Sequence, residues 1–140
     1  MRELFADTAY WIALINPRDN LHERAISVSS QLSGSLLVTS EMILTEVLNA
    51  LADYGSQVRA IAVATVQSIC ATPSVEVVPQ TSNLFREAFN LYSSRADKDW
   101  SLTDCASLVI MRQRGIMEAL TSDHHFEQSG YQALLRGPSL

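Results

Sequence analysis

Short apolar segments alternate with helical patterns along the chain, and this alternation constrains the fold more than any other feature. The apolar segments cover residues 4–6, 36–38, 75–78, 119–121 and 131–135. Between them, apolar residues recur every three or four positions, the spacing that gives a helix one buried face. Strands and helices that alternate in this way form a parallel sheet, because each helix returns the chain to the same edge of the sheet. The sequence therefore predicts an α/β fold whose central, mainly parallel sheet has four to five short strands.

The composition indicates one domain with a hydrophobic core. Of the 140 residues, 47% are hydrophobic and 18% are charged, which is unlike a disordered chain. We expect a single domain over residues 1–136 and a loose C-terminal tail over residues 137–140. The net charge of −5 argues against a nucleic-acid binder that relies on a basic surface. It still permits an enzyme that holds its substrate through metal ions, because bound cations reverse the local charge.

Nothing in the sequence indicates export or a membrane span. The first residues, MRELFADTAY, lack the apolar stretch and the cleavage site of a secretory signal. No apolar run is long enough to cross a bilayer, so we expect no membrane association. Cys70 and Cys105 stand in apolar surroundings without the spacing of metal ligands. This pattern indicates buried, reduced thiols in a cytoplasmic protein rather than a disulfide or a zinc site.

Four carboxylates stand at or near the edges of the expected elements. Asp7 closes the first apolar segment, Asp104 opens an almost wholly apolar helix, and Asp123 follows the fourth segment. Glu46 lies on a helix, on the side away from its apolar stripe. Each acid taken singly is explained as a helix cap or a solvated side chain. Taken together they indicate a site, since parallel sheets bind ligands outside the carboxyl ends of their strands, and clustered acids require a cation such as Mg²⁺ or Mn²⁺.

The sequence around these acids resembles that of the PIN domain family. The resemblance is carried by Asp7-Thr8 after the first strand, by Glu46 within a helix, and by the segments SLTDC and TSDHHF, which contain Asp104 and Asp123. It extends over essentially the whole chain, including the order of the elements. It implies a three-layer α/β/α fold and an Mg²⁺- or Mn²⁺-dependent endoribonuclease that hydrolyses RNA with a metal-activated water.

The resemblance also implies roles for the acids. Asp7 and Asp104 would be the main metal ligands, and Glu46 and Asp123 would complete the catalytic cluster, directly or through metal-bound water. All four acids are present, so the motif gives no sign of a dead enzyme.

Further expectations concern the supporting residues, the products and the partners. Thr8 and Thr121 would orient the carboxylates by hydrogen bonding. The family resemblance implies products with 3′-hydroxyl and 5′-phosphate ends. Many small members are VapC-type toxins of toxin–antitoxin pairs and form homodimers. We therefore expect an RNA substrate, an antitoxin protein and a second copy of the chain as partners, with the helical hairpin from Ile43 to Ile69 as the contact surface.

The residues that contact the substrate are less readable. The positively charged side chains that could hold RNA phosphates, each equally explained as solvated surface, are Arg18, Arg95, Lys98, Arg112 and Arg114. His124 and His125 adjoin Asp123 but receive no role. Asp99 lies in a charged loop near the expected site and could add charge there. For Trp11 and Trp100, burial is favoured over stacking on bases.

Two other functions compete with a ribonuclease. A PIN-like domain could serve as a binding or assembly module that retains the acids but has little or no nuclease activity. A metal phosphatase of the haloacid dehalogenase type is weaker, because the first strand is followed by Asp7-Thr8-Ala9-Tyr10 in place of the motif D-x-D-x-[TV].

Overall fold

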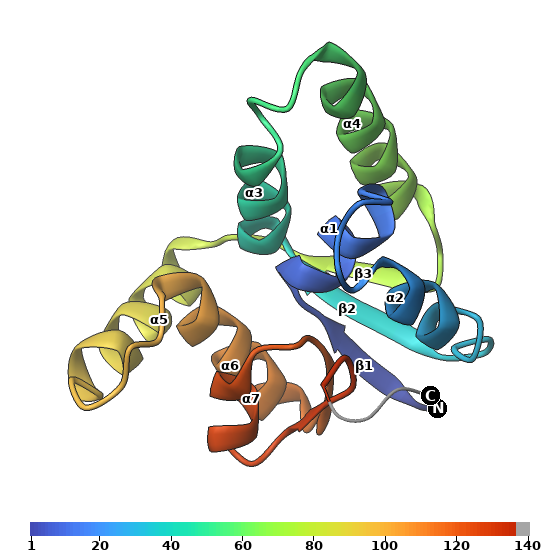
Figure 1. Ribbon diagram of the computed structural model, residues 1–140. Helices are drawn as coiled ribbons and strands as arrows, with labels where there is room; N and C mark the ends of the chain where they lie inside the picture. Colours follow the sequence, from blue (N-terminus) through green and yellow to red (C-terminus); the bar gives the residue numbers. More distant parts are fainter. Residues whose placement is uncertain (137–140) are drawn as a thin grey trace.

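A parallel sheet forms the centre of the protein (Figure 1). The computed structural model describes residues 1–136. The five strands, all paired in parallel and arranged in the order β3-β2-β1-β4-β5, are β1 (Glu3–Ala6), β2 (Leu36–Ser40), β3 (Val75–Val78), β4 (Glu118–Leu120) and β5 (Gln132–Ala133). In the central strand, Phe5 lies opposite Val38 on one side and Ala119 on the other. The predicted α/β fold with a parallel sheet is confirmed.

Helices cover both faces of the sheet, so the expected three layers are present. Figure 1 shows one layer above the sheet, made of α1 (Thr8–Ile15), α2 (His22–Ser29), α3 (Glu41–Ala50) and α4 (Ser56–Ala71). The other layer consists of α5 (Ser82–Ser94), α6 (Leu102–Arg114) and α7 (His124–Gln128). The strand order explains this division. The chain moves outward from β1 to β3 and then crosses to β4 on the other side of β1, and right-handed crossovers in opposite directions leave their helices on opposite faces.

The hydrophobic core lies between the strands and α6, the almost wholly apolar helix whose first turn carries Asp104. Leu4, Phe5 and Ala6 of β1 are fully buried. In α6, every residue from Cys105 to Met111 is buried, as its apolar sequence predicts. Trp11 and Trp100 are buried as well, at 5% and 7% exposure, so the expectation of burial is confirmed. Because α6 is locked into the core along most of its length, its first turn, which carries Asp104, has a fixed position.

One expectation about the cysteines is wrong. Cys105 is buried, but Cys70 is exposed, and both are free thiols. On α4 the buried residues are Ala62 and Ile69, which lie two turns apart on one face. Cys70 follows Ile69 and is therefore rotated away from that face, although its neighbours in the sequence are apolar.

The ends of two elements also differ from the sequence prediction. Thr121 lies just beyond β4 instead of inside it, and the last strand covers only Gln132–Ala133 of the expected residues 131–135. The expected tail, 137–140, lies outside the described residues. None of the helices within residues 1–136 combines the length and the apolar character that a membrane crossing requires.

Candidate active site

The site begins where two neighbouring strands end. Asp7 follows β1 and Thr121 follows β4. The sheet grows from β1 toward β3 on one side and from β4 toward β5 on the other, so the topological switch point lies between β1 and β4. The Asp7 N–H donates to the Leu120 carbonyl oxygen at 3.2 Å. The Thr121 hydroxyl donates to Asp7 Oδ2 at 2.7 Å. Parallel α/β sheets bind their ligands at this kind of switch point, outside the carboxyl ends of the strands.

Asp7 is a buried acid whose side chain is not used as a helix cap. It occupies the N-cap position of α1 but makes no side-chain capping hydrogen bond, and it is 7% exposed. The pKa of Asp7 is raised to about 7, chiefly by burial and also by the negative charges of Asp104 and Glu46, which together outweigh the hydrogen bonds from Thr121 and the Thr8 N–H. Burial therefore destabilises the charged carboxylate form of Asp7, and a cation bound beside it would offset this loss of stability.

The surroundings of Asp7 are fixed by a chain of hydrogen bonds at the end of β2. Thr39 is fully buried, and its hydroxyl donates to the Ala6 carbonyl oxygen at 2.9 Å. The same hydroxyl accepts from the indole N–H of Trp11 at 3.2 Å. These contacts tie α1 to both strands, so the turn that presents Asp7 has little freedom.

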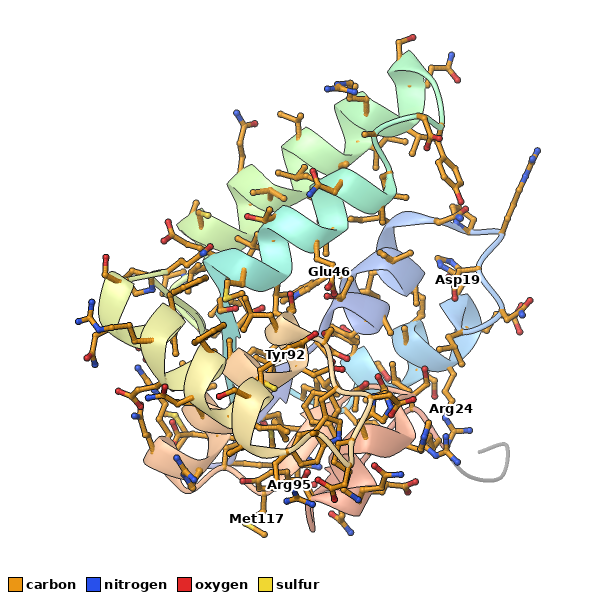
Figure 2. All side chains as sticks on the ribbon, turned by 90° about the vertical axis from the view of Figure 1, so that its left-hand side faces the viewer. Asp19, Arg24, Glu46, Tyr92, Arg95 and Met117 are labelled. Atoms are coloured by element: carbon orange, nitrogen blue, oxygen red, sulfur yellow. The ribbon has the colours of Figure 1, made fainter. Side chains whose placement is uncertain are left out.

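Glu46 reaches the site from α3. Its carboxylate accepts a hydrogen bond from the Thr8 hydroxyl on α1. Figure 2 shows Glu46 on the side of α3 that faces α1, and Asp19 in the loop after α1. The expected role of Thr8 in orienting a carboxylate has a matching contact in the structure.

Asp104 lies at the first turn of α6 and closes a capping box. The Ser101 hydroxyl accepts from the Asp104 N–H, and Asp104 Oδ2 accepts from the Ser101 N–H, both at 3.0 Å. Burial raises the pKa of Asp104, the backbone bond from Ser101 opposes this, and the nearby charge of Asp123 adds to the rise. The helix cap and a role in the site are therefore compatible for this residue.

Asp123 combines a cap with a place in the site in the same way. Its Oδ1 accepts from the His125 N–H at 3.0 Å at the start of α7. Its own N–H donates to the Thr121 hydroxyl at 3.0 Å. Thr121 thereby links Asp7 to Asp123, so one hydroxyl orients two of the four acids.

The four acids line one hollow of about 500 Å³. They come from the turn after β1 (Asp7), from α3 (Glu46), from α6 (Asp104) and from the turn before α7 (Asp123), so the convergence expected from the sequence is present. Asp19 lines the same hollow and was missed. Its Oδ1 accepts from the Leu21 N–H at 2.9 Å, and its only signal in the sequence is its place after the Asn16-Pro17 turn.

His125 is the second residue of the site that the sequence reasoning left without a role. Its side chain is 13% exposed. Nδ1 lies 3.0 Å from Asp123 Oδ1 and 3.3 Å from Asp104 Oδ2, and Nε2 lies 2.9 Å from Asp99 Oδ1. Burial lowers the pKa of His125, but the charges of Asp123, Asp104 and Asp99 outweigh it and the net shift is upward. Asp99, which was expected to add charge near the site, is thus connected to Asp104 and Asp123 by the imidazole of His125.

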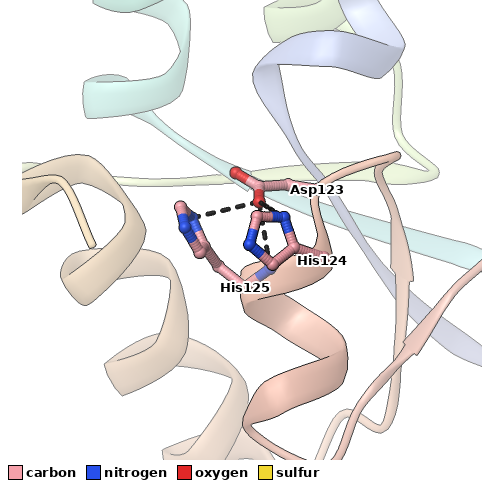
Figure 3. A group of neighbouring side chains, drawn as sticks. All are labelled: Asp123, His124 and His125. Atoms are coloured by element: carbon pink, nitrogen blue, oxygen red, sulfur yellow. Dashed lines mark hydrogen bonds and ion pairs between the residues drawn. The ribbon is translucent and has the colours of Figure 1, made fainter. Parts of the chain in front are cut away.

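Asp123, His124 and His125 form a compact group at the start of α7 (Figure 3). One ligand atom from each residue lies within 4.8 Å of the others, close enough to share a metal ion. His124 is half exposed, with Nδ1 3.7 Å from Asp123 Oδ1. The sequence signal for this group is the direct succession of the three residues in TSDHHF.

The residues of the hollow fit a hard divalent cation. The acids that line it offer carboxylate oxygens as metal ligands, and these are the ligands that Mg²⁺ and Mn²⁺ prefer. Within residues 1–136, the ion pairs that involve the four acids are formed with His124 and His125, and none with Lys or Arg. Among the described residues, no cationic side chain lies beside the buried Asp7 to balance its charge. The arrangement can bind a cation and present it to an anionic substrate.

The basic residues considered for substrate binding lie elsewhere. Arg114 pairs with Glu76, and Arg95 pairs with Asp97. Arg95, Lys98 and Arg112 line a different pocket, on the α5–α6–α7 side of the molecule. None of the basic side chains lines the acidic hollow among the described residues.

This combination of a parallel three-layer fold and an acidic hollow at the switch point is accounted for by one family. The chain belongs to the PIN domain family, whose family model matches residues 4–130. It is 27% identical over 128 residues to proteins of two Mycobacterium tuberculosis strains named 23S rRNA-specific endonuclease VapC20, a match that covers 91% of this chain and 95% of the relatives.

Solved structures agree with this assignment. The crystal structure of VapC20 from M. tuberculosis, described as a sarcin–ricin loop cleaving toxin, has a TM-score of 0.81 and 26% identity to this chain, with 91% of this chain and 95% of that chain covered. VapBC2 from Rickettsia felis, solved bound to a DNA fragment from its promoter, has a TM-score of 0.63 and 9% identity, with coverages of 94% and 96%. The second likeness concerns the fold only.

Proposed function

We propose that the protein is a metal-dependent endoribonuclease and the toxin of a toxin–antitoxin pair. The observation that carries the proposal is the convergence of Asp7, Glu46, Asp104 and Asp123 on one hollow at the switch point of the sheet. Membership of the PIN domain family and the activity named for VapC20 support it. A single domain over residues 1–136 is part of the same proposal.

In this proposal Asp7 and Asp104 are the main ligands of Mg²⁺ or Mn²⁺, and Glu46 and Asp123 complete the catalytic cluster. When bound, the cation supplies Lewis-acid activation of a water molecule and stabilises negative charge on the scissile phosphate. The products carry 3′-hydroxyl and 5′-phosphate ends.

The other side chains orient these acids. The hydroxyl of Thr121 holds Asp7 Oδ2, and the hydroxyl of Thr8 holds Glu46 Oε1. The Ser101 N–H holds Asp104 Oδ2. Oriented ligands lose less conformational freedom when they bind a metal, and such supporting hydrogen bonds are worth about 10- to 100-fold in metal affinity or activity.

His125 is proposed to position two of the acids. Its Nδ1 faces Asp104 and Asp123 from one side of the hollow, which reduces the repulsion between these carboxylates. His125→Ala would lose that support, and His124→Ala should have the smaller effect, because the half-exposed His124 ring lies farther from Asp123, at 3.7 Å.

The relatives suggest which substrate and partner to test first. VapC20 is named for 23S rRNA, so ribosomal RNA is the first substrate, both free and within ribosomes. An antitoxin protein would bind the toxin, and a homodimer would form through the helical hairpin of α3 and α4. Ile61 and Val63 of α4 are 50% and 46% exposed, which supports a contact surface there.

The test is an incubation of the pure protein with end-labelled 23S rRNA in Mg²⁺, Mn²⁺ or EDTA. We expect cleavage at discrete sites with either metal and none with EDTA, and 5′-phosphate ends on the downstream fragments. Tight metal binding without cleavage of any RNA offered would contradict the ribonuclease and favour a binding module. Asp7→Asn, purified identically, excludes contaminating nucleases.

A further inference from the structure

A second pocket lies on the α5–α6–α7 side of the molecule and has the opposite charge to the acidic hollow. It has a volume of about 240 Å³, and the lining residues that matter here are Arg95, Lys98, Trp100, Leu108, Arg112 and Tyr131. We call it the basic pocket. No carboxylate lines it among the described residues, although the chain carries 15 acidic and 10 basic residues. Three positive side chains are thus gathered at one place in a protein of net charge −5.

Two of the three positive charges are available to a ligand. Arg95 pairs with Asp97 through two hydrogen bonds of 2.9 and 3.0 Å, so its charge is largely balanced. Within residues 1–136, neither Lys98 nor Arg112 has a carboxylate within ion-pair distance. An anion in the pocket would supply the partner that these two side chains lack.

The indole ring of Trp100 lies beside two of the positive side chains of the pocket. The Arg95 guanidinium carbon lies 5.2 Å from the centre of the indole ring, and the Lys98 ammonium lies 5.9 Å from it. Cations held on an aromatic face lose less freedom when they bind a ligand. The indole N–H of Trp100 is buried and has no hydrogen-bond partner in the described structure, which is unusual for a buried donor.

The basic pocket and the acidic hollow share one loop and one short helix. Asp99 contacts His125 at the acidic hollow, while its neighbours Lys98 and Trp100 line the basic pocket. On α7, His125 contacts Asp104 and Asp123 of the hollow, and Gln128, less than one helical turn further on, lines the pocket. The two sites are therefore connected through residues 98–100 and through α7.

We propose that the basic pocket binds a nucleotide of the RNA that flanks the cleaved bond, with Lys98 and Arg112 on its phosphate and Tyr131 beside its base. This inference rests on the proposed ribonuclease function. RNA is favoured over an acidic peptide because the pocket combines cations with aromatic side chains, the combination that single-stranded nucleic acid requires. An acidic peptide would need the charges alone and no continuity with the acidic hollow.

The first test compares single variants that each remove one positive charge. Binding of a fluorescent single-stranded RNA of about 12 nucleotides is followed by anisotropy in EDTA between about 50 and 200 mM salt. We expect Lys98→Gln and Arg112→Gln each to weaken binding by about 3- to 10-fold and to reduce the salt slope by about 0.7. The control is Arg2→Gln just before β1, whose guanidinium pairs with Glu118 at the opposite end of the sheet from the acidic hollow. Equal effects for all three variants, or no effect in any, would overturn the proposal.

The second test follows the indole N–H signals by nuclear magnetic resonance. The chain has two tryptophans, and Trp100→Phe assigns the signals. We expect the short RNA to shift the Trp100 signal and leave that of Trp11, which is bonded to Thr39, in place. Inorganic phosphate at the same concentration should shift it less. A larger shift with a polyglutamate peptide than with RNA would contradict the choice of RNA.

The outcomes also separate this inference from the proposed function. If Lys98→Gln and Arg112→Gln weaken RNA binding but the native protein cleaves no RNA, the ribonuclease proposal fails and the pocket remains an RNA site. If the native protein cleaves RNA and both variants cleave it with unchanged KM, the pocket proposal fails and the ribonuclease remains.

Discussion

The acids at the two ends of the central sheet have pKa values shifted in opposite directions. Toward the amino ends of the strands, Glu118 pairs with Arg2 and Glu76 pairs with Arg114. Hydrogen bonds from these arginines lower the pKa of both glutamates. At the carboxyl ends, burial raises the pKa of Asp7 to about 7 and that of Asp104 also rises, and the acids face one another.

This difference distinguishes acids that stabilise the fold from acids whose burial lowers its stability. A paired surface glutamate adds a little stability and is easily replaced. A buried, unbalanced carboxylate costs stability, and groups with strongly perturbed pKa values gather at functional sites. The acids of the hollow therefore point to a ligand, whereas Glu118 and Glu76 are explained by their arginines.

The largest effect is expected on cleavage. Asp7→Asn and Asp104→Asn should each reduce metal-dependent RNA cleavage by roughly 10³-fold or more, because each removes a charged ligand and leaves the side-chain shape nearly unchanged. Initial cleavage rates of end-labelled RNA at saturating Mg²⁺ or Mn²⁺ measure this. Glu118→Gln at the other end of the sheet is the control and should cleave at the native rate. Native rates in both aspartate variants would remove the distinction between the two ends.

The next effect concerns the stability of the metal-free protein. The folded-state pKa of Asp7 lies above its ordinary value of 3.8, so the stability linked to its proton is fully present below about pH 4 and is lost as the pH rises through about 7. Asp7→Asn carries no charge to bury, and in EDTA at pH 8 it should be more stable than the native protein, by roughly 4 kcal/mol at most.

Urea unfolding in EDTA at pH 4, 6 and 8 measures this change. The gain from Asp7→Asn should grow with pH and vanish near pH 4. A loss of stability at pH 8, or a gain that does not depend on pH, would show that the Asp7 carboxylate is well accommodated without a cation.

Metal binding should produce a somewhat smaller stabilisation. A cation present at 100 times its dissociation constant stabilises the folded state by about 2.7 kcal/mol, so Mg²⁺ or Mn²⁺ should raise the Tm of the native protein. Thermal unfolding with and without metal measures the shift. Glu118→Gln should keep the shift and Asp104→Asn should lose most of it. Equal shifts in both variants would place the cation away from the hollow.

The sequence was sufficient to predict the parallel α/β fold and the convergence of the four acids on one hollow, for a physical reason. Asp7, Asp104 and Asp123 stand where apolar runs begin or end, and the ends of parallel strands meet at one edge of the sheet. The inward orientation of the His125 side chain could not be predicted from the sequence. The helix α7 has only five residues, and its pattern is too short to tell which of two adjacent histidines faces the core. The exposure of Cys70 and the grouping of Lys98 with Arg112 depend on how helices pack, which local sequence does not encode.

The smallest expected effect is at the amino ends of the strands and has the opposite sign to that of Asp7→Asn. The hydrogen bond from Arg2 lowers the pKa of Glu118, so the stability it contributes is present above its ordinary pKa of 4.5 and is lost as the pH falls below that value. Glu118→Gln should therefore reduce stability at pH 7 by about 0.2–1 kcal/mol, the range for partly exposed ion pairs, with a smaller loss in high salt. Urea unfolding at pH 7 and pH 3 checks both points. A loss that persists at pH 3 would mean that the glutamate contributes by packing and not by charge, and the contrast between the ends of the sheet would then rest on the hollow alone.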